Sequence, residues 1–352
     1  MTGTGGATTD ERIAAELAPE PALRAWVGDR LPGEGPFTIR RTTKGLSNEM
    51  FLLARSGHHW MLRRPPRTVN AKGAHDMARE LRVLRALEGT AVPHARGLLL
   101  CEDPAVLGAP FYVMERVTGV GLYDGVPAAL DRPGARPRIG HELVDALAEL
   151  HLVDWEAAGL GDFGRPDTFT ARQVARWTRQ LDSYRVRDLP DLDAAGTWLE
   201  ARVPTMPRAT LVHGDYGLHN VMYAPSLPVE LVAVVDWETA TIGDPLVDLG
   251  YLLSLWLEGD EPARWTASAL PYDSAGYPPR AELAARYAER TGADLAALDW
   301  YRAVGQFRVA CILEGAYARH LAGRADDPSM ASLRERVPNH AAYALAITRG
   351  EA

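Results

Sequence analysis

A polar loop between two apolar stretches holds the residues of this sequence that are best suited to catalysis. The segment 211–223 reads Leu-Val-His-Gly-Asp-Tyr-Gly-Leu-His-Asn-Val-Met-Tyr, with Asp215 and Asn220 in its polar part. A carboxylate at the end of a strand can accept a proton from a hydroxyl group or orient that hydroxyl for attack. A carboxamide oxygen leaving the same loop suits a hard cation such as Mg²⁺. The loop therefore combines a group that activates a hydroxyl with a group that binds a metal ion.

A second acidic segment, Val-Val-Asp-Trp-Glu over 234–238, places Asp236 at the end of an apolar stretch. If 221–223 and 231–236 pair as a hairpin, Asn220 and Asp236 come together as metal ligands. Phosphoryl transfer from a nucleotide needs a positioning carboxylate and oxygen ligands for the metal that bridges the phosphates. Each segment alone is equally well explained as a turn or a strand-end cap, because Asp and Gly are common in turns. The two segments together, in this order, favour phosphoryl transfer.

Short strands are expected in the N-terminal third, where they would form a sheet. Apolar patterning predicts these strands at 37–43, 50–54, 59–63, 98–102 and 110–115. Helical spacing appears over 11–31, with a break at Pro19, and over 71–87. This third of the chain is therefore expected to be rich in β-structure.

The pattern is mostly helical from about residue 138 onward. Helices are predicted at 139–152, 169–184, 192–202, 246–257, 280–292 and 298–321. A compact β segment interrupts them at 210–213, 221–223 and 231–236. A β-rich third followed by a helical body predicts an α+β fold with two lobes, divided after Glu115.

The composition excludes several classes of protein. The chain has 352 residues and a net charge of −8, which speaks against binding of a nucleic-acid backbone. Two cysteines, Cys101 and Cys311, cannot form a disulfide framework, and we expect two buried thiols. The apolar stretch 247–257 is too short to span a bilayer, and the N-terminus has no apolar signal segment. We therefore expect a cytoplasmic protein with no membrane partner.

The catalytic segments resemble a known family. HGDYGLHN, followed by VVDWETATIGDPLVDLGYLL, is similar to the aminoglycoside phosphotransferase family of small-molecule kinases. GLSNEMF, WMLRRPP, GRPDTFTARQVARWTRQLD and FRVACILEGAYAR resemble the branch of kinase-like domains associated with acyl-CoA dehydrogenases. The likeness runs from about Thr38 to His320 and implies a protein-kinase-like bilobal fold. It also implies nucleotide and Mg²⁺ bound between the lobes.

The resemblance assigns roles to the acidic segments. Asp215 corresponds to the catalytic base, and Asn220 and Asp236 correspond to the Mg²⁺ ligands. The lobe over 1–115, with its leading helix, is then expected to bind the nucleotide. The lobe over 116–352 is expected to carry the catalytic loop, the metal site and the acceptor-binding region.

A loop at 44–48 corresponds to the flap over the nucleotide phosphates, with Ser47 and Asn48 as its polar contacts. Backbone amides of such a loop can hold phosphate oxygens. The loop has a single glycine, unlike the Gly-rich loop of protein kinases. Without the downstream motif, it would be explained as an ordinary hairpin turn.

An arginine replaces the lysine that the wider superfamily has on its third strand. Strand alternation favours Arg63 as the residue facing the nucleotide and makes Arg64 its solvated neighbour. A guanidinium can grip phosphate oxygens in a bidentate manner, so the role is chemically possible. Glu80, on the following helix, is the expected ion-pair partner of Arg63. The alternative is that Glu80 is an ordinary exposed charge on that helix.

Further residues complete the expected site. Met114 and Glu115 correspond to the hinge that meets the adenine. Asp244 and Asp248 are expected to hold the loop and the next helix, with Asp244 as the N-cap.

Other polar residues have weaker claims to a role in the site. For His213 and His219, the favoured explanation is that they brace the loop. A basic ridge is either a solvated face or a site for an anionic substrate tail, and its members are Arg172, Arg176 and Arg179.

The leading hypothesis is an O-phosphotransferase that uses ATP or GTP with Mg²⁺ and acts on a small-molecule hydroxyl. The acceptor would be an aminoglycoside-like antibiotic or a metabolite of the hydroxyacyl-CoA type. The alternative is a nucleotide-binding pseudokinase that acts as a regulatory or scaffold module. The degenerate glycine loop and the missing lysine favour the pseudokinase, whereas the intact set of Asp215, Asn220 and Asp236 opposes it.

Overall fold

A computed structural model describes residues 8–42, 48–66, 75–122, 125–265, 275–324 and 327–352. The chain divides into two compact units. The first unit comprises 1–90, 94–118 and 235–238, and the second comprises 91–93, 119–234 and 239–352. The short acidic segment around Asp236 thus belongs with the N-terminal unit, although it lies far along the sequence.

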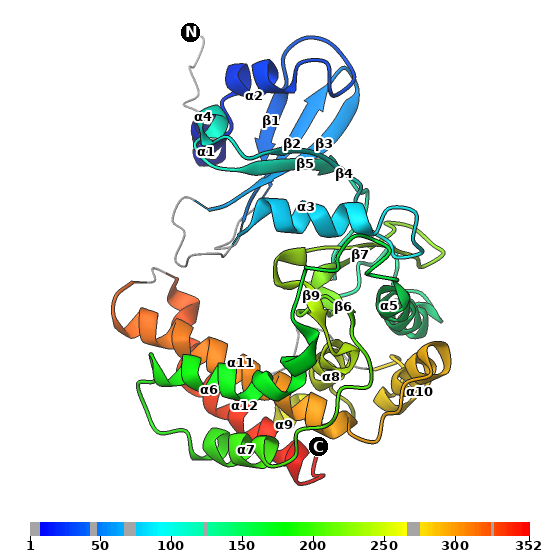
Figure 1. Cartoon of the computed structure of the whole chain (residues 1–352), viewed down its shortest axis with the longest axis vertical. Coiled ribbons are helices and arrows are strands. Elements are labelled where there is room, and N and C mark those ends of the chain that lie inside the picture. The colour runs from blue at the N-terminus through cyan, green and yellow to red at the C-terminus, as the bar shows by residue number, and fades with distance from the viewer. Residues whose placement is uncertain (1–7, 43–47, 67–74, 123–124, 266–274, 325–326) are drawn as a thin grey trace. The chain divides into compact units, whose positions relative to one another are not determined.

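The first unit is built on a five-stranded antiparallel sheet (Figure 1). Its strands, in spatial order, are β1 (Thr38–Arg41), β2 (Glu49–Arg55), β3 (His58–Arg64), β5 (Phe111–Glu115) and β4 (Gly97–Cys101). Alternate residues of β2 are buried, among them Phe51 and Leu53. This period-2 burial is the pattern that predicted the strands, because successive side chains point to opposite faces.

In the described part of this unit, the helices beside the sheet are α1 (Thr9–Leu17), α2 (Glu20–Val27), α3 (Met77–Ala86) and α4 (Pro104–Leu107). The helical pattern over 11–31 is broken after Leu17, and Pro19 is the N-cap of α2. Helix α3 lies along the sheet and packs on β4 and β5 (Figure 1). It begins at Met77, later than the spacing predicts, because Asp76 caps it by accepting a hydrogen bond from the backbone of Arg79. Residues 71–74 of the predicted helix lie outside the described residues.

The second unit contains the compact β segment as two antiparallel pairs. Strand β6 (Thr210–Val212) pairs with β9 (Thr241–Gly243), and β7 (Val221–Tyr223) pairs with β8 (Leu231–Val234). Val221 lies opposite Val234, so the hairpin predicted for these two strands is present. Strand β8 ends two residues before Asp236 rather than at it.

Helices form the rest of the second unit (Figure 1). They are α5 (Ala135–Leu152), α6 (Phe169–Asp182), α7 (Pro190–Glu200), α8 (Pro245–Leu255), α9 (Glu261–Arg264), α10 (Arg280–Thr291), α11 (Leu298–Leu321) and α12 (Leu333–Thr348). Helix α11 packs against α6, α7, α8 and α12, which makes it the central helix of this unit. Sequence spacing did not predict α12, which contains Pro338 in its interior.

Helix α8 is buried on all sides. Every residue from Pro245 to Leu255 is buried, including Asp248. A Cβ atom at Gly250 would lie 2.4 Å from the Tyr301 Cβ, so only glycine permits this approach of α8 to α11. Within the described residues, none of the helices has the length and apolar character needed to cross a membrane. Cys101 and Cys311 are both buried and unpaired, as predicted.

Candidate active site

Asp248 anchors the loop that follows β6. Its carboxylate accepts hydrogen bonds from the backbone N–H of His213 at 2.6 Å and of Gly214 at 2.7 Å. His151 Nε2 lies 3.3 Å from the same carboxylate, and all these groups belong to the second unit. Asp244 caps α8 through the backbone N–H of Leu246 at 3.1 Å. The predicted role of these two aspartates, to hold the loop and the helix, is confirmed.

Gly214 is required by the close packing of this loop. Its φ is +83°, and a Cβ atom there would lie 2.8 Å from the carbonyl oxygen of Thr239. The Thr239 hydroxyl in turn donates to the carbonyl oxygen of His213 at 2.7 Å. The backbone before Asp215 is therefore fixed from both sides.

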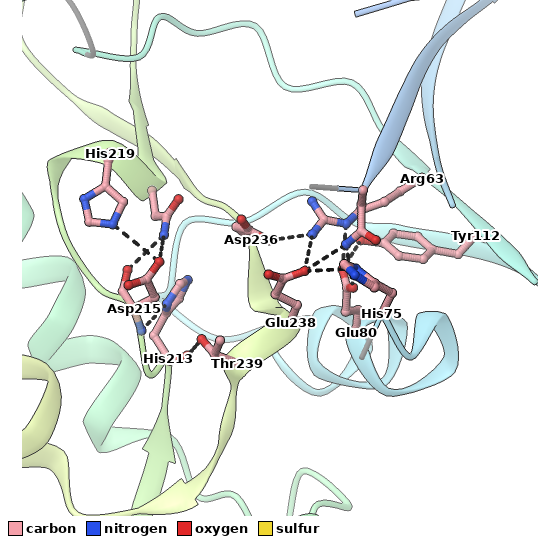
Figure 2. A network of polar contacts seen from close by, with 12 residues as sticks. Arg63, His75, Glu80, Tyr112, His213, Asp215, His219, Asp236, Glu238 and Thr239 are labelled. Carbon is pink, nitrogen blue, oxygen red and sulfur yellow. Dashed lines mark hydrogen bonds and ion pairs between the residues drawn. The ribbon is translucent and has the colours of Figure 1, made fainter. Parts of the chain in front are cut away.

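Several side chains hold the Asp215 carboxylate, among them Asn220, Arg308 and His219, the last of which Figure 2 shows beside it. Asn220 Nδ2 donates to Oδ2 at 3.0 Å and to the backbone carbonyl of Asp215 at 2.9 Å. His219 Nε2 lies 3.5 Å from Oδ2. Arg308 Nη2 lies 3.5 Å from Oδ1. The two hydrogen bonds of Asn220 both use its nitrogen, so its amide oxygen is the atom that could meet a cation.

The charge state of Asp215 follows from these neighbours. Burial raises the pKa of its carboxyl, but His219 and Arg308 lower the pKa by more, and the net pKa lies well below its usual range. Asp215 is therefore ionised at neutral pH. An ionised carboxylate can orient a hydroxyl group and accept its proton as a new bond forms. His213 and His219 brace this loop, since the backbone N–H of Asp215 donates to His213 Nδ1 at 3.2 Å.

Arg63 lies at the centre of a second polar cluster, within the first unit (Figure 2). Its Nε lies 2.8 Å from Glu80 Oε2, so the expected ion pair is present. Its Nη2 donates to Asp236 Oδ1 at 2.5 Å. The Tyr112 hydroxyl donates to Glu80 Oε2 at 3.1 Å. Glu80 is therefore a buried partner rather than an exposed helix charge.

Burial shapes the charges of this cluster. It raises the pKa of Glu80 to about 7, although Arg63 acts in the opposite direction. Burial also disfavours the charge on Arg63, but Glu80, Tyr112 and Asp236 together raise the pKa of the guanidinium above its ordinary value. Arg63 is thus a permanent cation among carboxylates. Asp236 has a φ of +68°, a left-handed conformation that is uncommon for residues other than glycine and that recurs at functional sites.

Asn48 and Glu238 extend the cluster. Asn48 Nδ2 donates to Glu80 Oε1 at 3.2 Å and to Glu238 Oε2 at 3.0 Å. Glu238 Oε2 also lies 3.6 Å from Arg63 Nη2 and 3.5 Å from His75 Nδ1. Because the amide nitrogen of Asn48 is bound to carboxylates, a contact of this residue with phosphate would fall to another of its atoms. Glu238 was not predicted, and its position two residues after Asp236 is the sequence signal that could have indicated it.

The prediction for Arg64 is wrong. Arg64 is buried, and its Nη1 donates to the backbone carbonyls of Leu17 and of Leu107, the latter at 2.7 Å. Alternation on β3 fails here because the end of the strand is covered by other parts of the first unit. Arg64 therefore links β3 to α1 and α4 instead of contacting solvent.

The other residues predicted to contact the nucleotide are Met114, Glu115 and Ser47. Met114 and Glu115 end β5, where Met114 lies opposite Met61 and Glu115 opposite Trp60. The backbone N–H of Glu115 donates to the Arg96 carbonyl at 2.9 Å, so this donor is already used. Ser47 lies outside the described residues.

Arg308 is a site residue that the sequence did not indicate. It lies on α11, and its Nη1 donates to the carbonyl oxygen of Gly214. Helical spacing predicted the helix, and its segment 307–319 resembles the family branch. That likeness gave no role to Arg308 itself.

The residue types predicted as metal ligands suit Mg²⁺ better than a softer metal. In the described part of the chain, no group of three or more His, Cys, Asp or Glu side chains gathers as a metal site. A Mg²⁺ ion commonly takes one or two protein ligands and completes its shell with phosphate oxygens and water. An amide oxygen, such as that of Asn220, and a carboxylate, such as that of Asp236, are each donors of this hard, oxygen type.

The profile of the phosphotransferase enzyme family matches residues 38–304. The chain therefore belongs to this family. It is 32% identical over 311 residues to acyl-CoA dehydrogenase family member 10 of Mus musculus, covering 87% of this chain and 29% of that protein. It is also 32% identical over 311 residues to family member 11 of Rattus norvegicus, covering 86% of this chain and 40% of that protein. The chain thus spans well under half of these curated relatives.

Solved structures agree with this assignment. A putative aminoglycoside phosphotransferase from Ralstonia eutropha superposes with a TM-score of 0.78 at 33% identity, covering 94% of this chain and 98% of that one. A macrolide 2′-phosphotransferase type I superposes with a TM-score of 0.60 at 19% identity, covering 94% and 98%. The predicted protein-kinase-like α+β fold and the predicted enzyme class, a phosphotransferase, are confirmed. The predicted kinship with domains found in acyl-CoA dehydrogenase family members is confirmed as well.

Proposed function

We propose that this protein transfers the γ-phosphoryl group of ATP or GTP to a hydroxyl group of a small molecule. The observation that carries the proposal is Asp215, an ionised carboxylate fixed by Asn220 and Arg308 on a loop that Asp248 anchors. Asp215 orients the hydroxyl and takes its proton. The hydroxyl oxygen bonds to the γ-phosphorus as the bond from that phosphorus to the β-phosphate bridging oxygen breaks.

The nucleotide would be held by the groups predicted for it. Asn220 and Asp236 would hold Mg²⁺, which neutralises charge on the phosphates. Arg63 supplies a permanent cation for the α- and β-phosphate oxygens. The flap residues Ser47 and Asn48 would cover the phosphates, Glu80 would orient Arg63, and Met114 and Glu115 would meet the base. An aminoglycoside phosphotransferase of the same fold has been solved with ADP and hygromycin B, which supports ATP as the donor.

The charges beside Asp215 favour an acceptor with an anionic group. Burial lowers the pKa of Arg176, and repulsion from Arg308 and Arg172 lowers it further, so three cations of the second unit lie near one another. Arg308 is engaged by Asp215, but Arg172 and Arg176 would disfavour a polycationic aminoglycoside and attract a phosphate-bearing tail. A hydroxyacyl thioester of coenzyme A has such a tail and carries the required hydroxyl. We therefore place this acceptor class ahead of aminoglycosides.

A transfer assay tests this proposal. Purified protein with Mg²⁺ and γ-labelled ATP or GTP is incubated with hydroxyacyl-CoAs of varied chain length and, in parallel, with a panel of aminoglycosides. We expect label in a hydroxyacyl-CoA and none above background in the aminoglycosides. Label only in aminoglycosides would overturn the acceptor class. Nucleotide binding with no transfer to any acceptor would favour the pseudokinase alternative.

The proposal also includes the cellular location of the protein and the roles of its two lobes. A cytoplasmic location would supply ATP and Mg²⁺, and a reducing compartment suits the two unpaired thiols. Residues 1–115 would serve as the nucleotide-binding lobe. Residues 116–352 would carry the catalytic loop, the metal site and the acceptor region.

A further inference from the structure

Arg308 contacts the catalytic loop at two points. Its Nη1 donates to the backbone carbonyl of Gly214, and its Nη2 lies 3.5 Å from Asp215 Oδ1. The side chain comes from α11, the central helix of the second unit, and is only 14% exposed. A single planar guanidinium therefore connects a rigid helix with both the backbone and the carboxylate of the loop.

Two aromatic rings fix the guanidinium in this place. Its central carbon lies 5.5 Å from the ring centroid of Trp177 on α6 and 5.1 Å from that of Tyr251 on α8. Cation–π contacts at such distances favour a cation and limit its rotation. The rings thus aim the two terminal nitrogens at the loop.

The loop backbone has other supports, so Arg308 is not needed merely to fold it. Asp248 binds the N–H groups of His213 and Gly214, and Thr239 binds the carbonyl of His213. Of the two carboxylate oxygens of Asp215, Asn220 and His219 contact Oδ2, and Asn220 also donates to the Asp215 backbone carbonyl. Arg308 Nη2 contacts Oδ1 at 3.5 Å, and the Tyr251 hydroxyl forms a further hydrogen bond with the Asp215 carboxylate.

We propose that Arg308 is a positioning residue for phosphoryl transfer, which sets the orientation of the Asp215 carboxylate by holding Oδ1 and the preceding carbonyl. This inference rests on the proposed function of Asp215. It assigns to α11 a direct part in the geometry of the site. Removal of the guanidinium leaves Asp215 and its Oδ2 contacts in place but lets the carboxylate turn.

Three variants test the proposal by kinetics. R308A should lower kcat about 100-fold, the loss typical of a reacting group misplaced by about 1 Å. The KM values for nucleotide and acceptor should change by no more than about twofold, because Arg308 contacts neither in this account. R308K, which can donate to the Gly214 carbonyl but lacks the planar fork, should recover part of kcat. R319A removes an exposed arginine of the same helix and should leave all constants unchanged.

Added guanidinium ion gives a further test. Millimolar guanidinium chloride should raise the kcat of R308A and leave that of R319A unchanged, because the small cation can occupy the vacated site. An R308A variant with wild-type kcat would overturn the proposal. So would an R308A variant whose acceptor KM rises while kcat stays constant, since Arg308 would then bind the acceptor.

A measurement without turnover separates this proposal from the proposed function. Backbone hydrogen exchange over residues 213–220 should be faster in R308A than in the wild type or R319A, with unfolding midpoints that agree. Faster exchange with no transfer activity in the wild type would refute the proposed function and leave Arg308 as a support of the loop. Unchanged exchange together with unchanged kcat would refute the role of Arg308.

Discussion

At the scale of single residues, the site depends on charges whose neighbours decide their state. Asp215 is kept ionised by His219 and Arg308, whereas Glu80 is driven toward its neutral form by burial. The two carboxyl groups have opposite pKa shifts because burial outweighs the ion pair with Arg63 at Glu80, whereas His219 and Arg308 outweigh burial at Asp215. Each shift has a consequence that can be measured.

The pKa of Glu80 predicts how stability depends on pH. Its pKa in the folded protein is about 7, above the ordinary value of a glutamate, so the folded state binds more protons between these values. Stability should therefore fall as the pH rises from about 5 to 7, with a slope of up to about 1.4 kcal/mol per pH unit. The E80Q variant should lack this slope in urea unfolding without nucleotide or metal. The exposed E88Q variant should keep it, and an equal slope in E80Q would contradict the assignment.

Some residues could be predicted from sequence and others could not. Asp244 was predicted correctly because a helix cap follows from short-range pattern, whereas the contacts of Asp248 with His213 and Gly214 arise from tertiary packing. Arg64 was predicted wrongly, since alternation along β3 does not reveal what covers the end of the strand. Arg308 was missed because it meets Asp215 only through tertiary packing of α11.

At the scale of elements, helices and strands with strong hydrophobic periodicity were predicted correctly. Short strands and helices whose pattern is interrupted were not. Helix α11 has the predicted bounds, and β7 begins and ends at the predicted residues. Strand β9 is three residues long and shows no alternation that could reveal it. Helix α12 was missed because Pro338 is a helix breaker by propensity.

Arg187 explains how α12 tolerates its proline. Pro338 has no N–H to donate to the carbonyl of Arg334, four residues earlier. Arg187 Nη1 donates to that carbonyl at 2.6 Å instead. The same side chain forms an ion pair with buried Glu314 of α11 at 2.8 Å. Arg187 thus joins the two helices.

Loss of Arg187 should be costly. R187A leaves the buried Glu314 carboxylate unpaired and should lower the free energy of unfolding by about 3 kcal/mol or more. The double variant R187A/E314A should lose less than the sum of the two single changes. R185A, which removes the pair with the exposed Asp193, should cost at most about 1 kcal/mol. Chemical denaturation of these four variants and the wild type measures these values, and equal losses in R187A and R185A would contradict the role of the buried pair.

Asp248 on α8, which anchors the catalytic loop, gives a second prediction at this scale. D248A leaves the buried N–H groups of His213 and Gly214 without their acceptor and should destabilise the protein by about 2–4 kcal/mol. Transfer activity should fall as well, even where the protein remains folded, because the loop that carries Asp215 loses its support. An unfolding free energy within 0.5 kcal/mol of wild type, about the effect of an ordinary surface substitution, would show that the anchor is dispensable.

At the scale of the whole molecule, the chain has a net charge of −8, which would repel an anionic nucleotide. Local cations would offset this repulsion. Arg63 in the first unit lies among carboxylates, and Arg308 in the second lies between Asp215 and two aromatic rings, so a negative average hides local cations. The relatives in the acyl-CoA dehydrogenase family are longer than this chain, which spans 29% of one and 40% of another. The phosphotransferase unit alone is therefore what the likeness covers.

Nucleotide binding should stabilise the folded chain. ATP with Mg²⁺ at 100 times its Kd should add about 2.7 kcal/mol to the free energy of unfolding. D236A should lose the part of this gain that depends on Mg²⁺ while keeping a smaller response to ATP alone. Thermal unfolding with ATP, with and without Mg²⁺, measures both parts. A Mg²⁺ response in D236A equal to that of the wild type would remove Asp236 from the metal site.

The central claim is that Asp215 performs the phosphoryl transfer step. The most direct test is single-turnover phosphate transfer by D215A, with bound nucleotide measured in the same sample. We predict that D215A binds Mg²⁺ and ATP with affinity close to that of the wild type but transfers phosphate 10²–10⁴-fold more slowly, the range typical of a lost general base. D193A, which removes an exposed carboxylate, should transfer at the wild-type rate. A transfer rate in D215A within threefold of the wild type would contradict the account.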